Sequence, residues 1–316
     1  MDPPSRPFKK TQKPQELALA LRGVHNFMVT PFHASLELNA EGLRQNIHHH
    51  AAARAQDMTI LVGGGMGELL ALDVEEHRLL AEAAVAGAEG KMPVVVGVRG
   101  GYRLAMRMAR NAEEAGADAI FLLAPPNGTE SSEGAYQYMS SIAKSVSIGV
   151  VVSMGHGFQG AIESYWPDLI RRLADLPNVV GFEDSLGDVK IGQLLGEQIL
   201  ERFLWVARGE GGAIRSLPAG ARAYTAAVAT LAPNACREFW KHGVAGNLDA
   251  MNEVFHSRIE PVAKIRGLKP GYRASAVKVA LEALGRAGGT VRPPEVRVTD
   301  EDRKHIVEVI GKHAER

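Results

Sequence analysis

The sequence predicts an α/β fold, a (β/α)8 (TIM) barrel that is followed by a group of C-terminal helices. Between residues 23 and 226, short runs of β-branched and other apolar residues alternate with longer amphipathic segments. Most of the short runs are apolar almost throughout, which is typical of parallel strands buried on both faces. The chain has 316 residues, and such barrels commonly reach this size as one domain. A barrel therefore explains the pattern better than a doubly wound sheet.

Each short run is predicted to be a strand, and each amphipathic segment between two runs is predicted to be a helix. The expected strands lie at residues 23–29, 58–62, 93–97, 119–123, 149–152, 179–182, 203–207 and 221–226. The expected helices lie at residues 41–54, 75–89, 102–115, 132–145, 161–175, 188–200 and 211–218. Strands that alternate with helices in this way indicate βα units and a parallel sheet.

The chain is expected to divide into three parts. Residues 1–21 form a polar leader and an N-terminal helix, residues 22–231 form the barrel, and residues 232–316 form helices packed on it. The helices of the last part are expected at residues 234–241, 248–265, 274–287 and 300–314. The leader lacks the apolar stretch of a secretory signal, and no apolar run is long enough to cross a membrane. We therefore expect a cytoplasmic protein without a membrane partner.

Composition argues against several classes of function. Lys and Arg number 36, as do Asp and Glu, so the formal net charge is zero and nucleic-acid binding is not expected. The single cysteine, Cys236, rules out a disulfide framework and favours a reducing compartment. The glycine run at residues 63–67 follows the second expected strand and lacks the spacing of a dinucleotide fingerprint. We expect no cofactor.

A loop after the second strand is the first candidate for substrate binding. In a barrel the active site forms at the carboxyl ends of the strands, and here the loop contains Gly64, Gly65, Met66, Gly67 and Glu68. Glycines let backbone N–H groups converge on an anion, so a substrate carboxylate is the expected ligand. The alternative is a tight turn in which Glu68 only favours the dipole of the next helix.

Two titratable side chains after later strands are candidates for proton transfer. Glu183 stands at the end of the sixth expected strand, where partial desolvation would suit a general acid or base. The alternative is a structural carboxylate paired with Arg208. His156 follows the fifth strand and could carry protons near neutral pH, although a lone loop histidine is more often a surface residue.

The last two strands supply further candidates for substrate binding: Arg208, Glu210, Tyr224 and Thr225. Arg208 could clamp a carboxylate through a bidentate contact. Glu68, Glu183, Glu210 and His156 could together hold a divalent ion, but no tight spacing of ligands marks such a site. No metal is therefore assigned.

Motifs spread over residues 22–312 are similar to those of the dihydrodipicolinate synthase/N-acetylneuraminate lyase family. Each motif is weak alone, but their order and spacing together are specific. The motifs are Thr30-Pro31-Phe32, Gly64-x-x-Gly67-Glu68, Leu72, Glu76, Gly116-Ala117-Asp118, Pro125, Glu133-Gly134, Gly181-x-x-Asp184-Ser185-x-Gly187-Asp188, Lys278, Gly288 and Arg292-x-Pro294. The resemblance implies a (β/α)8 class I aldolase or related lyase, and a homo-oligomer, either a dimer or a tetramer.

The resemblance also implies that the family's catalytic groups are replaced in this sequence. Its Schiff-base lysine at the end of strand six falls on Glu183, and a carboxylate cannot form an imine. Its proton-relaying tyrosine on strand five falls on Ser153, which we keep as a catalytic candidate. A tyrosine that crosses the family's interface falls on Asn127, which we keep as a substrate-binding candidate. Only the loop glycines carry over as a carboxylate grip.

The expected function is that of a divergent, lyase-like enzyme. It would act on a small carboxylated carbonyl compound without a Schiff base, with Glu183 as general acid or base. Aldol cleavage, hydration or dehydration, and isomerisation all remain open. One alternative is a non-catalytic descendant that serves as a ligand sensor or an assembly subunit. A second alternative is a metal-assisted lyase.

Overall fold

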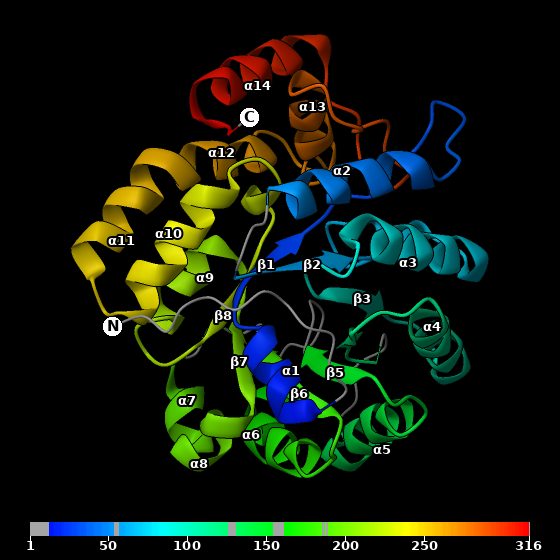
Figure 1. Ribbon diagram of the computed structural model, residues 1–316, viewed down its shortest axis with the longest axis vertical. Helices are drawn as coiled ribbons and strands as arrows, with labels where there is room; N and C mark the ends of the chain where they lie inside the picture. Colours follow the sequence, from blue (N-terminus) through cyan, green and yellow to red (C-terminus); the bar gives the residue numbers. More distant parts are fainter. Residues whose placement is uncertain are drawn as a thin grey trace.

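The chain folds into a closed barrel of eight parallel strands in sequence order, which confirms the predicted fold class (Figure 1). The computed structural model describes residues 13–53, 57–125, 131–153, 161–184, 187 and 189–315. The strands are β1 (Gly23–Phe27), β2 (Met58–Val62), β3 (Val94–Val98), β4 (Ala119–Leu123), β5 (Gly149–Ser153), β6 (Val179–Asp184), β7 (Leu204–Ala207) and β8 (Ala223–Ala226). β1 pairs with both β2 and β8, so the sheet has no open edge.

Helices connect the strands and cover the outside of the barrel (Figure 1). They are α2 (Ala40–Ala52), α3 (Val74–Ala88), α4 (Tyr102–Glu114), α5 (Ser132–Ala143), α6 (Ala161–Ala174), α7 (Lys190–Leu195), α8 (Glu197–Arg202) and α9 (Gly209–Ser216). The prediction of a single helix at residues 188–200 is wrong, because the chain forms α7 and α8 there instead. They meet at Gly196, whose φ of 79° ends the first helix.

The amino end of the barrel is closed by α1 (Pro14–Ala20). Leu17 and Leu21 reach into the apolar interior, where they join Val151, Val180 and Leu204. Figure 1 shows α1 lying across this end of the strands. The site must therefore be sought at the opposite, carboxyl end.

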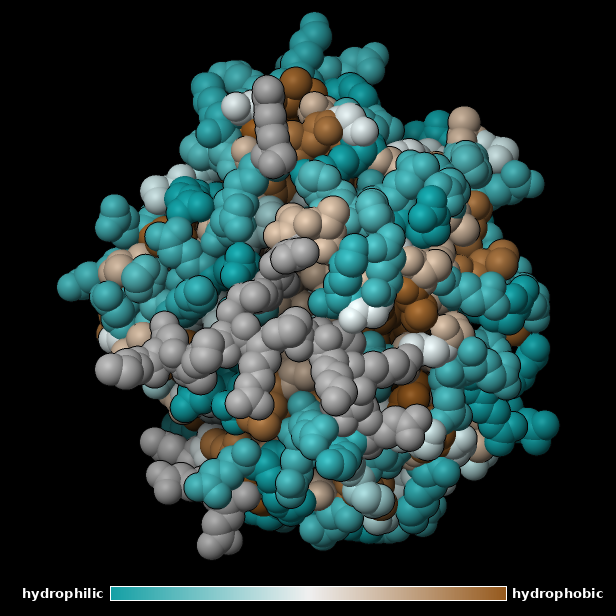
Figure 2. Space-filling model, in the orientation of Figure 1, coloured by the Kyte–Doolittle hydropathy of each residue, from teal (hydrophilic) through white to brown (hydrophobic). Residues whose placement is uncertain are grey.

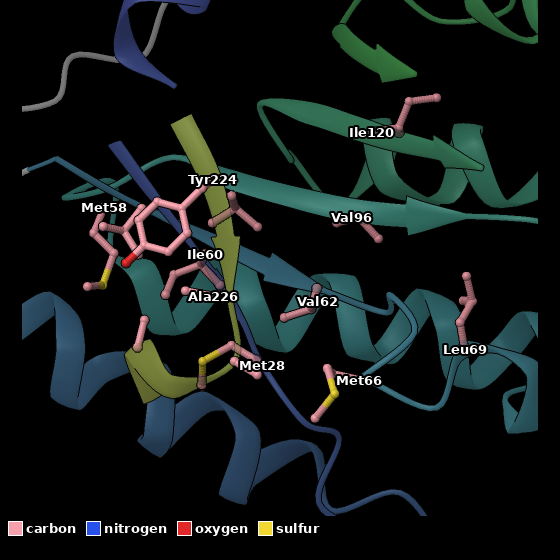
Figure 3. Close-up of a cluster of buried hydrophobic side chains, with 14 of the residues drawn as sticks. Met28, Met58, Ile60, Val62, Met66, Leu69, Val96, Ile120, Tyr224 and Ala226 are labelled. Carbon is pink, nitrogen blue, oxygen red and sulfur yellow. The ribbon is translucent and has the colours of Figure 1, made fainter. Parts of the chain in front are cut away.

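Most apolar side chains lie in a second, larger layer between the strands and the surrounding helices. Figure 3 shows part of it, with Met28, Ile60 and Val96 among the members. Strand residues alternate between this layer and the interior of the barrel, as their two-residue period requires. The visible face of the molecule is mostly hydrophilic, with small separate apolar patches (Figure 2). Within the described residues, no helix combines the length and the apolar character needed to span a bilayer.

Residues after the barrel form further helices, which pack beside β1 and α2 (Figure 1). They are α10 (Pro233–Val244), α11 (Leu248–Val254), a π-helical turn (Phe255–Ile259), α12 (Glu260–Lys264), α13 (Ser275–Ala283) and α14 (Asp300–His313). The amide of Asn46 on α2 donates to the carbonyl of Ala287 and accepts from its N–H. The helix expected at residues 248–265 is thus interrupted by the π-helical turn.

Two of the buried histidines, His25 and His50, are expected to make the stability of the fold sensitive to acid. Burial lowers the pKa of His25 from 6.5 to about 4 and, together with Arg286, that of His50 to about 3. An unfolded chain would protonate both near pH 6.5, so between pH 6.5 and 4 the unfolded state binds more protons. The free energy of unfolding should therefore fall as the pH falls through this window.

We expect the variant His50→Gln to lose part of this pH dependence. Up to one proton fewer is taken up on unfolding, which lowers the slope of stability against pH by at most about 1.4 kcal/mol per pH unit, a limit approached near pH 5. Urea unfolding at several pH values between 7 and 5 measures the slope. The exposed His256, which pairs with Glu260, offers a control variant, His256→Gln. Equal slopes in all three proteins would contradict the expectation.

Candidate functional site

A carboxylate and two hydroxyl groups meet at the carboxyl end of the barrel. Glu183 on β6 stands directly opposite Ser153 on β5 in the register of the sheet. The Oγ of Ser153 donates to Oε2 of Glu183 at 2.6 Å, and Glu183 is only 5% exposed. The short distance is typical of a hydroxyl that donates to a carboxylate. Ser153 and Glu183, named separately from the sequence, therefore form one contact.

Thr225 brings β8 into the same group. Its hydroxyl lies 3.5 Å from Oε1 of Glu183 and accepts a hydrogen bond from the N–H of Gly209 at 2.9 Å. The Glu183 carboxylate is thus held firmly at Oε2 by Ser153, while the Thr225 hydroxyl makes only a long contact with Oε1. A carboxylate fixed in this way is suited to take or return a proton at a defined position.

The loop after β2 runs close to neighbouring backbone and side chains. A Cβ atom on Gly97 would lie 1.9 Å from the carbonyl oxygen of Gly63, and one on Gly64 would lie 2.2 Å from the ring of Phe27. Only glycine allows this approach. The N–H groups of Gly65 and Met66 have no acceptor among the described residues. This geometry is compatible with an anion held by the loop backbone.

The side chain of Glu68 is not at the barrel mouth, which corrects its expected position. Its Oε1 lies 2.5 Å from Nζ of Lys278 on α13, and both side chains are almost fully buried. Its Oε2 accepts from the N–H of Arg292. The Lys278 ammonium also donates to the carbonyl of Thr290 and lies over the ring of Phe32. Glu68 therefore anchors the glycine loop to the C-terminal helices.

Met66 and Tyr224 also lie elsewhere than expected. Both belong to the apolar layer outside the strands, where Figure 3 draws Tyr224 beside Met58 and Ile60. The Tyr224 hydroxyl donates to the carbonyl of Cys236. Adjacent strand residues face opposite sides, so Tyr224 must point outward when Thr225 points toward Glu183. The side chains of Met66 and Tyr224 thus contribute packing.

Glu210 is held in a buried ion pair with Arg266, which is a further correction. Its Oε2 accepts from Arg266 at 2.8 Å, and its Oε1 accepts from the N–H of Val228. Burial alone would raise the pKa of Glu210, but the Arg266 guanidinium and this N–H outweigh it and hold the pKa below its usual value. The sequence gives no local signal for such a distant partner.

Arg208 precedes α9 and is partly exposed. It forms no ion pair with Glu183 or with any other described residue. The structural pairing of Glu183 with Arg208 is therefore not observed. Arg273, which is not among the residues expected from the sequence, donates to the carbonyl of Gly65 at 2.9 Å.

The predicted residues His156 and Asn127 lie outside the described part of the chain. Among the residues that are described, no three His, Cys, Asp or Glu side chains gather in a way that could hold a metal ion. Two members of the suggested ion-binding group, Glu68 and Glu210, are instead engaged by Lys278 and Arg266.

Comparison with known proteins identifies a family whose model matches this chain and several proteins of similar sequence. Residues 20–313 match the model of the dihydrodipicolinate synthetase family. A probable 5-dehydro-4-deoxyglucarate dehydratase from Bacillus licheniformis is 30% identical over 93% of this chain and 95% of its own length. One from Corynebacterium glutamicum is 31% identical over 94% of each chain.

Solved structures support the fold. Dihydrodipicolinate synthase from Bacillus clausii superimposes with a TM-score of 0.82 at 23% identity, covering 93% of this chain and 98% of its own. N-acetylneuraminate lyase from Mycoplasma synoviae superimposes with a TM-score of 0.80 at 19% identity, covering 93% of this chain and 98% of its own. These likenesses establish a shared barrel with C-terminal helices.

Proposed function

Because the chain belongs to the dihydrodipicolinate synthetase family, we propose that it is a lyase-like enzyme that uses Glu183 in place of an imine-forming lysine. The substrate is a small carboxylated carbonyl compound. The observation that carries the proposal is the Glu183 carboxylate, buried at the carboxyl end of β6 and hydrogen-bonded by Ser153. The relatives named as 5-dehydro-4-deoxyglucarate dehydratases favour a carboxylated sugar acid and loss of water.

The proposed reaction is an elimination of water next to a ketone. The Glu183 carboxylate removes a proton from the carbon beside the carbonyl, and the electron pair of the C–H bond forms an enolate. The enolate then expels the β-hydroxyl, which leaves as water with the proton that Glu183 returns. A C=C bond replaces one C–H and one C–O bond, so no oxidant or reductant is needed.

Charge on the enolate must be stabilised without an iminium ion. Backbone N–H groups of Gly65 and Met66 would bind the substrate carboxylate, and hydrogen-bond donors at the mouth would stabilise the enolate oxygen. The partly exposed Arg208 is the candidate cation for this role. Ser153 and Thr225 act as positioning residues, since they contact Glu183.

We expect that pyruvate and borohydride will not trap a covalent adduct on this protein. The position of the family's lysine is occupied by Glu183, and Lys278 is fully buried in its ion pair with Glu68. Intact mass spectrometry after the incubation measures the result. The variant Glu183→Lys, with an amine at that position, tests whether the position can support imine formation. An adduct on a barrel lysine of the unmodified protein would overturn the proposal that no Schiff base forms.

The direct test of the activity is incubation with 5-dehydro-4-deoxyglucarate, followed by NMR detection of the dehydrated product. Turnover by the unmodified protein supports the proposal. Binding without turnover favours the second candidate, a non-catalytic descendant that senses a ligand or serves in an assembly. Its supporting observation is that Met66, Glu68, Glu210 and Tyr224 serve packing or ion pairs.

We also propose that the protein is a homo-oligomer, a dimer or a tetramer, as the family resemblance implies. Sedimentation velocity would test this proposal, and a monomer across the working concentration range would contradict it. The expected cytoplasmic location and the three-part division of the chain likewise stay predictions.

A further inference from the structure

A cavity of about 250 Å³ lies at the amino end of the barrel, between α1, α8 and the start of β7. Its lining includes the apolar and aromatic side chains Leu19, Phe203, Leu204 and Trp205. Because the strands are parallel, this cavity and Glu183 lie at opposite ends of the barrel. It is therefore separate from the proposed active site.

Arginines dominate the charge of this cavity. Arg22, Arg202 and Arg222 contribute to its lining, against one carboxylate, that of Glu201. The guanidinium group of Arg202 lies 3.9 Å from the Oδ1 atom of Asp175, a long ion pair. Arg22 and Arg222 form no ion pair with any described residue.

The two arginines without a carboxylate partner are near enough to repel each other. Burial and, after it, the charge of Arg222 lower the pKa of Arg22. Like charges held together beside an apolar floor destabilise a fold unless something neutralises them. A bound anion would remove this repulsion and accept hydrogen bonds from both guanidinium groups.

We propose that this cavity is a binding site for a small organic anion, and that Arg22 and Arg222 hold its carboxylate or phosphate group. The apolar floor, which includes Trp205, would contact the carbon part of the ligand. The volume limits the ligand to the size of a small metabolite. The proposal does not depend on the reaction proposed for Glu183.

The test compares thermal unfolding of the whole protein in sodium chloride, inorganic phosphate and malonate at equal ionic strength. Phosphate and malonate distinguish the two kinds of anionic group. We expect one of them to raise the Tm saturably, by about 5 °C at a concentration one hundred times its Kd. The rise should disappear in Arg22→Gln and in Arg222→Gln.

A matched variant controls for general salt effects. Arg107→Gln removes an exposed arginine from α4 and should keep the full rise. In chloride alone, Arg222→Gln should unfold at the same or a higher temperature than the parent, because one source of repulsion is gone. The proposal is overturned if neither anion gives a saturable rise, or if the rise persists undiminished in Arg22→Gln, in Arg222→Gln or in the double variant Arg22→Gln/Arg222→Gln.

Discussion

Replacing Glu183 by glutamine should reduce kcat by about 10²- to 10⁴-fold, the usual contribution of a general acid or base. Glutamine keeps the size of the side chain and can still hydrogen-bond with Ser153, but it cannot accept a proton from carbon. The KM for 5-dehydro-4-deoxyglucarate should change little, because the proposed carboxylate grip lies in the Gly65–Met66 loop. Steady-state kinetics with purified variant and parent measure both constants.

Two further variants separate proton transfer from structure. Ser153→Ala removes one of the hydroxyls that contact the Glu183 carboxylate, and we expect it to lower kcat less than Glu183→Gln and to alter the pH profile. Glu114→Gln changes an exposed carboxylate on α4 and should leave both constants unchanged. Full activity in Glu183→Gln, with folding verified by circular dichroism, would refute the role of Glu183.

The barrel was predictable because its strands are nearly continuous apolar runs. Their number and order can be read from the sequence without knowing which distant residues make contact. The carboxyl end of β6 was harder to predict. The apolar run stops at residue 182, yet the strand continues through Asp184, because backbone pairing with β7 does not depend on apolar side chains. A hydrophobicity pattern therefore misses a polar strand end of this kind, which is recognised only from the backbone pairing with the neighbouring strand.

The spatial grouping of the candidate site residues could be predicted in part. Ser153, Glu183 and Thr225 follow from strand ends and do meet. Tyr224 could have been placed correctly, because strand neighbours alternate and only one of Tyr224 and Thr225 can face inward. The positions of Glu68 and Glu210 could not, since their partners come from α13 and from the turn after α12. Such pairings depend on tertiary packing that no local pattern encodes.

The variant Lys278→Met should destabilise the protein by about 3–5 kcal/mol, the usual effect of removing one partner from a buried ion pair. Lys278 is fully buried, so among the described residues the Glu68 carboxylate would keep only the Arg292 N–H as a partner in a nearly dry site. Burial lowers the pKa of Lys278, while Glu68 opposes this effect. Urea unfolding at pH 7 measures the loss of stability.

A double-mutant cycle shows whether the loss comes from an unpaired charge. Glu68→Gln/Lys278→Met leaves no charge in the pair, so its destabilisation should be smaller than the sum of the two single variants. Arg303→Gln breaks the exposed ion pair with Glu282 and should cost at most about 1 kcal/mol. Additive effects of Glu68→Gln and Lys278→Met would show that the ion pair does not couple the glycine loop to α13. In that case the loop would be positioned by its close backbone contacts and by the hydrogen bonds that Thr30 donates to Gly67 and Arg273 donates to Gly65.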